Sequence, residues 1–476
     1  MTQTTAPAPT TAPASTTAPA PASVTERASQ AAGQGPAIGA TAQSCPRVTL
    51  EIGVFFDGTG NNRDNAGQGD EGSYANARSN VALLSQLYKN RPAYWTRNSC
   101  GDYARKFAMI YKQGIGTVSG GADNRFPGQA MGMGATGVEA RVYEACLDVG
   151  QMVSRLSPGL EPTEIVLDVF GFSRGAAAAR YFVNCFRQGY VEYWRNYVKL
   201  ERAYLPEGRN IRIRYVGIFD TVAAIGLGTN ERNGPVNVHL SAAQADRINH
   251  LTALNEYREN FRLNHNLPGG GQSQGLPGAH SDVGGGYGSP GDFVKVHSGG
   301  TLLAHSRREA ENYRDNFQRA RGPSEQARKA IWVDIGFLNP DEPTGGYVDV
   351  GQIRSRQQRS FMGPPRTLYE VDLAGYINRP WVQPGLSRIA LRMMYDDALA
   401  AGVPLIAYTD SGEYRIPDDL QPIAARLMAG AALSATERRF VLRNFGHISA
   451  HHDGIGMAAD RNYVRVIYPN QPGRAR

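Results

Sequence analysis

The chain has 476 residues, of which 41% are hydrophobic, so it can bury a substantial core and hold one large domain or several smaller ones. Lys and Arg outnumber Asp and Glu by 50 to 43, which gives a formal net charge of +7, and the basic residues are scattered in the sequence instead of forming one cluster. Because a nucleic-acid surface needs its cations gathered on one face, we predict no nucleic-acid partner. No run of 18 uncharged apolar residues occurs, so we expect no membrane-spanning helix.

The N-terminal segment 1–42 is dominated by Thr, Ala and Pro. It has neither the positive start nor the apolar run of a secretory signal, and we expect a disordered tail of polyproline character. The chain is therefore predicted to be made in the cytoplasm without a Sec signal. Four cysteines stand at irregular positions without a CxxC pattern, and we expect mostly buried thiols: Cys45, Cys100, Cys146 and Cys185.

Taken in chain order, apolar strand-like runs alternate with segments of helical periodicity. Strands are expected at 48–62, 105–117, 211–226, 330–337 and 366–374, and helices at 81–90, 137–157, 301–321 and 387–402, with a helix-like segment inside 241–263. Residues 165–180 add a strand that is followed by an Ala-rich helix. This alternation predicts an α/β fold with a mainly parallel sheet and helices on both faces. We expect the catalytic domain to span 43–405, with a mixed C-terminal extension over 406–476 packed on it.

Residues 165–180 read IVLDVFGFSRGAAAAR, an apolar strand that breaks at Gly-Phe-Ser-Arg-Gly and continues as an Ala-rich helix. A nucleophile elbow requires this order, because the strand must deliver the serine to a sharp turn directly before a helix. Gly171 and Gly175 leave room for the close approach of strand and helix. Ser173 is thus the predicted nucleophile, and the alternative is an ordinary strand-turn-helix with a buried serine.

A second GxSxG match, Gly271-Gln-Ser273-Gln-Gly275, lacks a preceding apolar strand and a following helix. We expect a flexible loop there and no catalytic role for Ser273.

The other two members of a serine triad are expected in the order acid and then histidine, each after a strand. Asp220 ends the strand that follows the elbow, and His280 lies further on in the Gly-rich loop 277–288. Ser173 would attack an ester carbonyl, His280 would take its proton, and Asp220 would orient the imidazole. The alternatives are an Asp that caps a turn and a loop histidine bonded to backbone.

An oxyanion hole needs two N–H donors. Arg174, directly after the nucleophile, supplies the first, and Gly58 or Thr59 in the loop 56–60 is expected to supply the second. Asp57 is expected to brace that loop, since a carboxylate beside an oxyanion would oppose it. A cation shared by Asp57 and Asp282 is a lesser alternative, and no metal or cofactor is expected to be required.

A second histidine cluster competes for the role of base. His447, His451 and His452 stand close together beside Asp453. They lack the spacing of a helical zinc site and a partnering cysteine, so a surface or supporting role is favoured.

Five motifs together resemble the first class of type VI secretion lipase effectors, the Tle phospholipases: FFDGTGNN at 55–62, YKQGIGT at 111–117, GFSRGAAAAR at 171–180, GIFDTVAAIG at 217–226 and PGAHSDVGGGY at 277–287. The resemblance covers roughly residues 48–405. It implies an α/β-hydrolase that cleaves acyl esters of glycerophospholipids (phospholipase A type), with Ser173, Asp220 and His280 as its triad.

The resemblance also implies an antibacterial effector that acts on membranes in the periplasm of a target bacterium. A cognate immunity protein and a VgrG-like spike component are the implied protein partners. Two other functions remain open: a soluble carboxylesterase for small or polysaccharide-bound esters, and a catalytically silent structural or adaptor protein. From its composition, segment 226–278 is expected to be a mobile lid beside the acyl pocket.

Overall fold

The computed structural model describes residues 48–90, 94–98, 101–124, 129, 132–157, 164–195, 198–205, 211–226, 236–341, 347–358 and 365–473. All of them belong to one unit, Cys45–Arg476. The expected tail over 1–42, and Cys45 and Cys100, lie outside the described residues. The proposed boundary between 405 and 406 stays a prediction.

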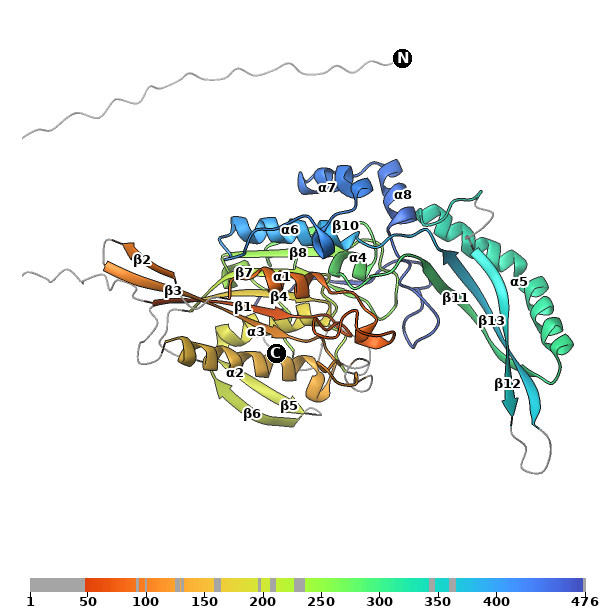
Figure 1. Cartoon of the computed structure of the whole chain (residues 1–476), viewed down its shortest axis with the longest axis horizontal. Helices are drawn as coiled ribbons and strands as arrows, with labels where there is room; N and C mark the ends of the chain where they lie inside the picture. The colour runs from red at the N-terminus through yellow and green to blue at the C-terminus, as the bar shows by residue number, and fades with distance from the viewer. Residues whose placement is uncertain are drawn as a thin grey trace, which may run out of the picture. The chain divides into compact units, whose positions relative to one another are not determined.

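A seven-stranded sheet forms the centre of the molecule (Figure 1). Its strand order is β10 (Gln272–Leu276), β8 (Arg247–Ala253), β7 (Ile211–Phe219), β4 (Glu164–Phe172), β1 (Val48–Phe56), β3 (Gly101–Lys112) and β2 (Tyr94–Asn98). Every neighbouring pair is parallel except β2 with β3. The predicted mainly parallel α/β sheet is confirmed.

Helices cover both faces of this sheet. On one face, α2 (Val138–Leu156) and α3 (Arg174–Gln188) form a buried apolar cluster with β1 and β4. On the other face, α1 (Asn80–Leu87) and α6 (Ser387–Ala400) form a second cluster. Because β1 and β4 are covered on both sides, nearly all of their residues are buried, which explains their continuous apolar sequences.

Three expectations for the region 226–278 are wrong. The segment with helical spacing contains β8, whose residues are buried between β7 and β10. The second GxSxG match is not a loop, because residues 272–276 are the edge strand β10. The described residues of this region do not form a lid, because β8 and β10 belong to the central sheet. Residues 227–235 lie outside the described part of the chain.

A three-stranded antiparallel sheet with one long helix extends to one side of the central sheet (Figure 1). It consists of β11 (Asp292–Ala304), β13 (Arg366–Arg379) and β12 (Tyr347–Gln358), with α5 (Arg307–Ile335) packed on it. The expected strand at 330–337 is wrong, because most of it is the last turn of α5. Trp332 is buried there against Phe337, and Gly336 ends the helix with φ 106°.

The C-terminal part of the chain contains α7 (Gln421–Met428), α8 (Ala435–Asn444) and the short strand β14 (Ile467–Tyr468). β14 pairs in parallel with β9 (Leu263–Asn264), which lies between β8 and β10 in the sequence. A hairpin of β5 (Tyr190–Arg195) and β6 (Val198–Tyr204) follows α3. Cys146 and Cys185 are both buried, as expected.

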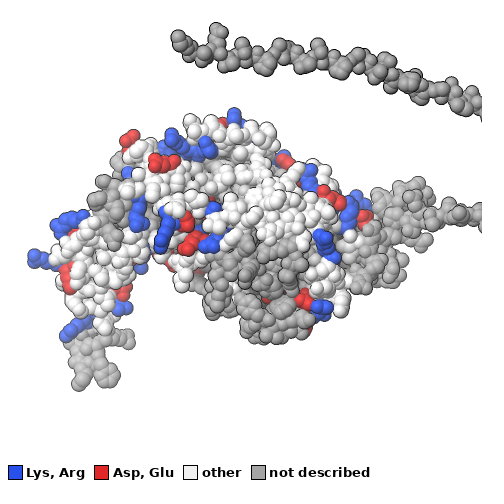
Figure 2. All heavy atoms as spheres, turned by 180° about the vertical axis from the view of Figure 1, so that it is seen from behind, with Lys and Arg blue, Asp and Glu red and all other residues white. Residues whose placement is uncertain are grey.

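Among the described helices, none combines the length and apolar content needed to cross a bilayer. On the face drawn in Figure 2, basic and acidic side chains are interspersed over the described surface.

Candidate active site

Ser173 occupies the turn between β4 and α3. Its backbone angles are φ 59° and ψ −126°, a region that side-chain-bearing residues rarely adopt. The Ser173 N–H donates to the carbonyl of Phe219 at 3.1 Å, which ties the turn to the end of β7. A strained backbone fixed by its surroundings is typical of functional positions. The geometry is that of a nucleophile elbow.

The two flanking glycines are required by close backbone contacts. A Cβ at Gly171 would stand 2.4 Å from the carbonyl oxygen of Gly175. A Cβ at Gly175 would stand 2.3 Å from the carbonyl oxygens of both Phe56 and Asp57. Helix α3 therefore begins against the end of β1 as well as against β4, and only glycine fits there.

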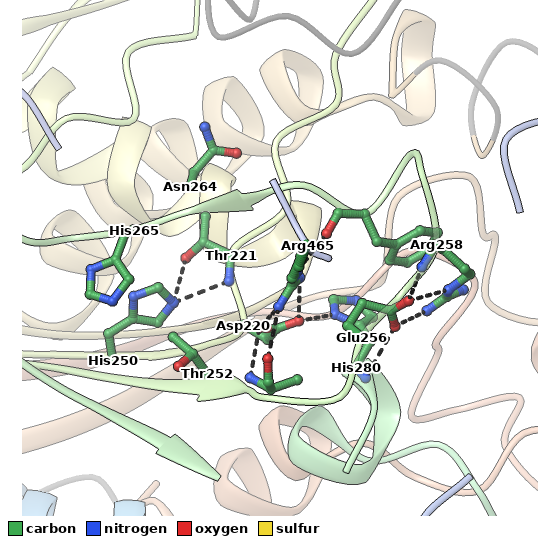
Figure 3. Close-up of polar contacts among 12 residues, drawn as sticks. Asp220, Thr221, His250, Thr252, Glu256, Arg258, Asn264, His265, His280 and Arg465 are labelled. Carbon is green, nitrogen blue, oxygen red and sulfur yellow. Dashed lines mark hydrogen bonds and ion pairs between the residues drawn. The ribbon is translucent and has the colours of Figure 1, made fainter. Parts of the chain in front are cut away.

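Asp220 and His280 meet at the carboxyl ends of the sheet strands (Figure 3). Asp220 directly follows β7 with φ 38°, and its Oδ2 lies 2.5 Å from Nδ1 of His280. His280 opens a short helix, α4 (His280–Gly284), instead of lying in the expected loop. The His280 ring lies 4.6 Å from the ring of Phe172, the residue before Ser173, and 5.0 Å from the ring of Phe261.

Arg465 is a member of this site that sequence reasoning missed. Its Nη1 donates to Asp220 Oδ1 at 2.7 Å and its Nη2 donates to Asp220 Oδ2 at 2.8 Å. Burial alone would raise the pKa of Asp220, but the Arg465 charge and the hydrogen bond from His280 outweigh it. They hold the pKa of Asp220 well below its usual range, so the carboxylate stays ionised.

His280 is held in one orientation by its neighbours. Because Asp220 is an ionised acceptor, Nδ1 of His280 carries the proton, which leaves Nε2 as the acceptor nitrogen. Burial lowers the pKa of His280 and the charge of Arg258 adds to this, although Asp220 opposes the shift. The imidazole is thus neutral at rest, the state that a general base requires.

A second buried carboxylate, Glu256, supports the backbone of His280. Its Oε2 accepts the His280 N–H at 3.2 Å, and Arg258 and Ser449 also bond it. Burial would raise the pKa of Glu256, but the charge and hydrogen bonds of Arg258 lower it to about 2. The sequence around residue 256 contains no recognisable motif. The roles of Glu256 and Arg258, like that of Arg465, could therefore not be predicted from the sequence.

The loop after β1 lies beside the elbow. Arg174 is the first residue of α3, so its N–H has no acceptor within the helix. Its guanidinium reaches that loop, where Nη1 donates to Thr59 Oγ1 at 3.1 Å. The Gly58 N–H, one of the expected oxyanion donors, instead donates to Asp57 Oδ1 at 2.8 Å. This leaves Thr59 as the candidate second donor.

Asp57 is buried and accepts further hydrogen bonds from the Ser79 and Tyr111 hydroxyls, both at 2.5 Å. Burial raises the pKa of Asp57 above its ordinary value. These contacts connect the loop to α1 and β3, as expected of a bracing residue.

Asp282 and His447 form a separate buried pair. Asp282 Oδ1 lies 2.7 Å from His447 Nδ1, and its Oδ2 accepts the backbone N–H groups of Ala279 and His447. The Tyr287 ring stacks on His447 at 3.8 Å. The expectation that His447 lies on the surface is wrong, because its side chain is buried. It bonds Asp282 and not the predicted catalytic acid, Asp220. His451 is half-buried and His452 is exposed.

Among the described residues, no group of three or more His, Cys, Asp and Glu side chains is placed to hold a metal ion. Asp57 and Asp282 are each bonded to the protein donors given above.

The second serine, Ser273, lacks a base. His265 Nε2 lies 3.5 Å from Ser273 Oγ, but His265 Nδ1 accepts the Leu267 N–H at 2.9 Å. Because neutral imidazole carries one proton, Nε2 is then the donor and cannot remove a proton from Ser273.

Residues 51–190 and 188–302, together more than half of the chain, match the family model described as "T6SS, Phospholipase effector Tle1-like, catalytic domain". No curated protein matches the chain. A solved structure described as the Tle1 effector bound to the VgrG spike from the type 6 secretion system has a similar fold. Its identity is 24% and its TM-score 0.59, over 89% of this chain and 94% of that one. An uncharacterized protein from Pseudomonas aeruginosa is 20% identical with a TM-score of 0.46, over 82% and 52%.

Proposed function

The chain belongs to the Tle1-like family of type VI secretion phospholipase effectors, and on this premise we propose that it is a serine hydrolase of the phospholipase A type. The observation that carries the proposal is the Asp220–His280 hydrogen bond, together with a serine in elbow geometry whose N–H bonds Phe219, the residue before Asp220. Those are the three residue types, in the chain order of α/β-hydrolases, that acyl transfer by a serine requires.

In the proposed reaction, Ser173 Oγ attacks the carbonyl carbon of a phospholipid acyl ester while His280 Nε2 accepts its proton. Asp220 stabilises the imidazolium that forms. The N–H groups of Arg174 and Thr59 donate to the oxyanion of the tetrahedral intermediate. His280 then returns the proton to the leaving lysophospholipid alkoxide, and a water molecule, activated by the same histidine, hydrolyses the acyl enzyme.

We further propose that the protein acts on membranes in the periplasm of a target bacterium. A cognate immunity protein and a VgrG-like spike component are its proposed partners. Family membership supports the proposal of an effector, and VgrG is the partner of the structurally similar protein.

The test is release of fatty acid from vesicles of phosphatidylethanolamine and phosphatidylglycerol. The wild-type protein should release fatty acid and Ser173→Ala should not. Ser273→Ala is the matched control, because Ser273 lies in the other GxSxG sequence. Hydrolysis of short soluble esters without any release from vesicles would favour the carboxylesterase instead.

A further inference from the structure

We propose that Arg465 is a positioning residue for the catalytic acid, so that the C-terminal segment completes the active site. The inference rests on the proposed function, because it assigns Asp220 and His280 to the triad. It deepens that function by naming a residue outside the matched region 51–302 on which the triad depends.

The contacts of Arg465 join the acid to both segments that surround it. Besides its two bonds to Asp220, Arg465 donates from Nε to the Phe261 carbonyl at 2.7 Å and from Nη1 to the Ala253 carbonyl at 3.2 Å. Ala253 in turn donates its N–H to Asp220 Oδ1 at 2.9 Å. The guanidinium therefore fixes the carboxylate plane together with the end of β8, and Figure 3 shows the two side chains facing each other.

The charge of Arg465 matters because Asp220 is fully buried. Without a cation, desolvation would raise the pKa of Asp220 and weaken its preference for the ionised form. Nη2 of Arg465 and Nδ1 of His280 bond the same oxygen, Oδ2 of Asp220, so the cation lies close to the imidazolium that forms during the reaction. Four charged or titratable groups therefore surround the His280 side chain and backbone: Asp220, Glu256, Arg258 and Arg465.

The local chain directs Arg465 inward. Val464 and Val466, on either side of it, are 62% and 41% exposed, whereas the Arg465 side chain is 8% exposed. This alternation is that of an extended strand. The register is fixed directly after it, because the Leu263 N–H donates to the Val466 carbonyl at 3.0 Å and β14 pairs with β9. A segment 245 positions from Asp220 is thereby aligned with the acid.

The experiment compares Arg465→Ala, Arg465→Lys and wild type on a soluble ester across pH, with Arg461→Gln as the matched control. Arg461 lies four positions earlier and is exposed. We expect kcat of Arg465→Ala to fall roughly 10- to 100-fold with little change in KM, because a displaced acid misorients the base. Arg465→Lys should fall less, since it keeps the charge but cannot bond both oxygens as a planar fork.

The pH profile separates positioning from mere folding support. Removing a cation favours the protonated imidazole, so the acidic limb of kcat/KM should move up by about one pH unit in Arg465→Ala. Guanidinium added at a non-denaturing concentration should restore the activity of Arg465→Ala and return the acidic limb of its kcat/KM profile to the wild-type position. The rate at which a fluorophosphonate labels Ser173 reports the reactivity of the proposed nucleophile. This second measurement requires no lipid substrate.

Two results would overturn the proposal. One is an Arg465→Ala protein with wild-type kcat and an unchanged acidic limb. The other is a lower Tm with lost activity, no shift of the limb and no rescue, which would show a structural role alone. If the wild type is labelled at Ser173 but releases no fatty acid from vesicles, the phospholipase proposal fails while the Arg465 comparison still stands.

Discussion

Nδ1 of His280 lies 2.5 Å from Oδ2 of Asp220, although 60 positions separate the two residues in the chain. The fold brings them together because β7 ends directly before Asp220 and α4 begins at His280 at the same edge of the sheet. Ligands and catalytic groups of parallel sheets gather at this carboxyl edge.

Asp220→Asn should reduce kcat by about 10⁴ while the protein stays folded, because an amide cannot stabilise the imidazolium and favours the wrong tautomer. Combining it with His280→Ala should add little, since members of one catalytic unit are strongly non-additive. Steady-state kinetics on a soluble ester measure both effects. Multiplicative losses in the double variant would show that the two residues act separately.

Ser173→Ala should reduce hydrolysis by roughly 10⁴ or more, because it removes the nucleophile. Ser273→Ala should retain most of the activity, because His265 donates to Ser273 and cannot activate it. Thermal unfolding of both variants checks that each is folded. Similar losses in the two variants would contradict the assignment of the elbow.

The rate should depend on the protonation of His280. The base must be neutral to accept the serine proton, so activity is lost as pH falls through the pKa of His280. Because burial lowers that pKa below the ordinary value of 6.5, the midpoint of the acidic limb of kcat/KM should lie below pH 6.5. A pH–rate profile on a neutral soluble ester measures this, and an acidic limb above pH 6.5 would contradict it.

The strand, turn and helix around Ser173 could be predicted because they depend on local order, and the contact of Asp220 with His280 could be predicted because both follow strands of one parallel sheet. The sequence predicted a helix where the structure has strand β8. The spacing of the apolar residues did not reveal this, because β8 is buried by its neighbours β7 and β10 in the sheet. Sequence reasoning missed Arg465 and Glu256 because their roles come from contacts between distant segments. Arg465 lies in a short alternating run that carries no motif, and pairing between distant segments, such as β14 with β9, brings it to Asp220.

The contact made by the Gly58 N–H could not be predicted, for a similar reason. A glycine after a strand indicates an amide that can turn inward, but it does not indicate which acceptor that amide meets. In the structure the neighbouring Asp57 carboxylate takes it, and Asp57 is itself held by Ser79 and Tyr111.

Gly175→Ala should destabilise the protein by about 1–3 kcal/mol or prevent folding, because the new Cβ would meet two backbone carbonyl oxygens. The matched control is Gly150→Ala in α2, where nothing lies within 4 Å of an added Cβ. That change should stabilise the protein by up to about 1 kcal/mol through helix propensity. Urea unfolding gives both values. Equal stability of the two variants would show that the close approach at the elbow is not tight.

Expression directed to a bacterial periplasm by an added signal peptide should be toxic, whereas cytoplasmic expression should be milder. The argument joins membership of an effector family with the proposed hydrolysis of membrane lipids, since a producer must survive its own enzyme. Toxicity should vanish with Ser173→Ala and remain with Ser273→Ala, and it should fall when a cognate immunity protein is co-expressed in the periplasm. Growth curves at matched protein levels, with lysophospholipid measured in the same cells, link toxicity to the chemistry. Equal growth of the wild-type and Ser173→Ala strains would contradict the antibacterial proposal, even for an enzyme that hydrolyses vesicles in vitro.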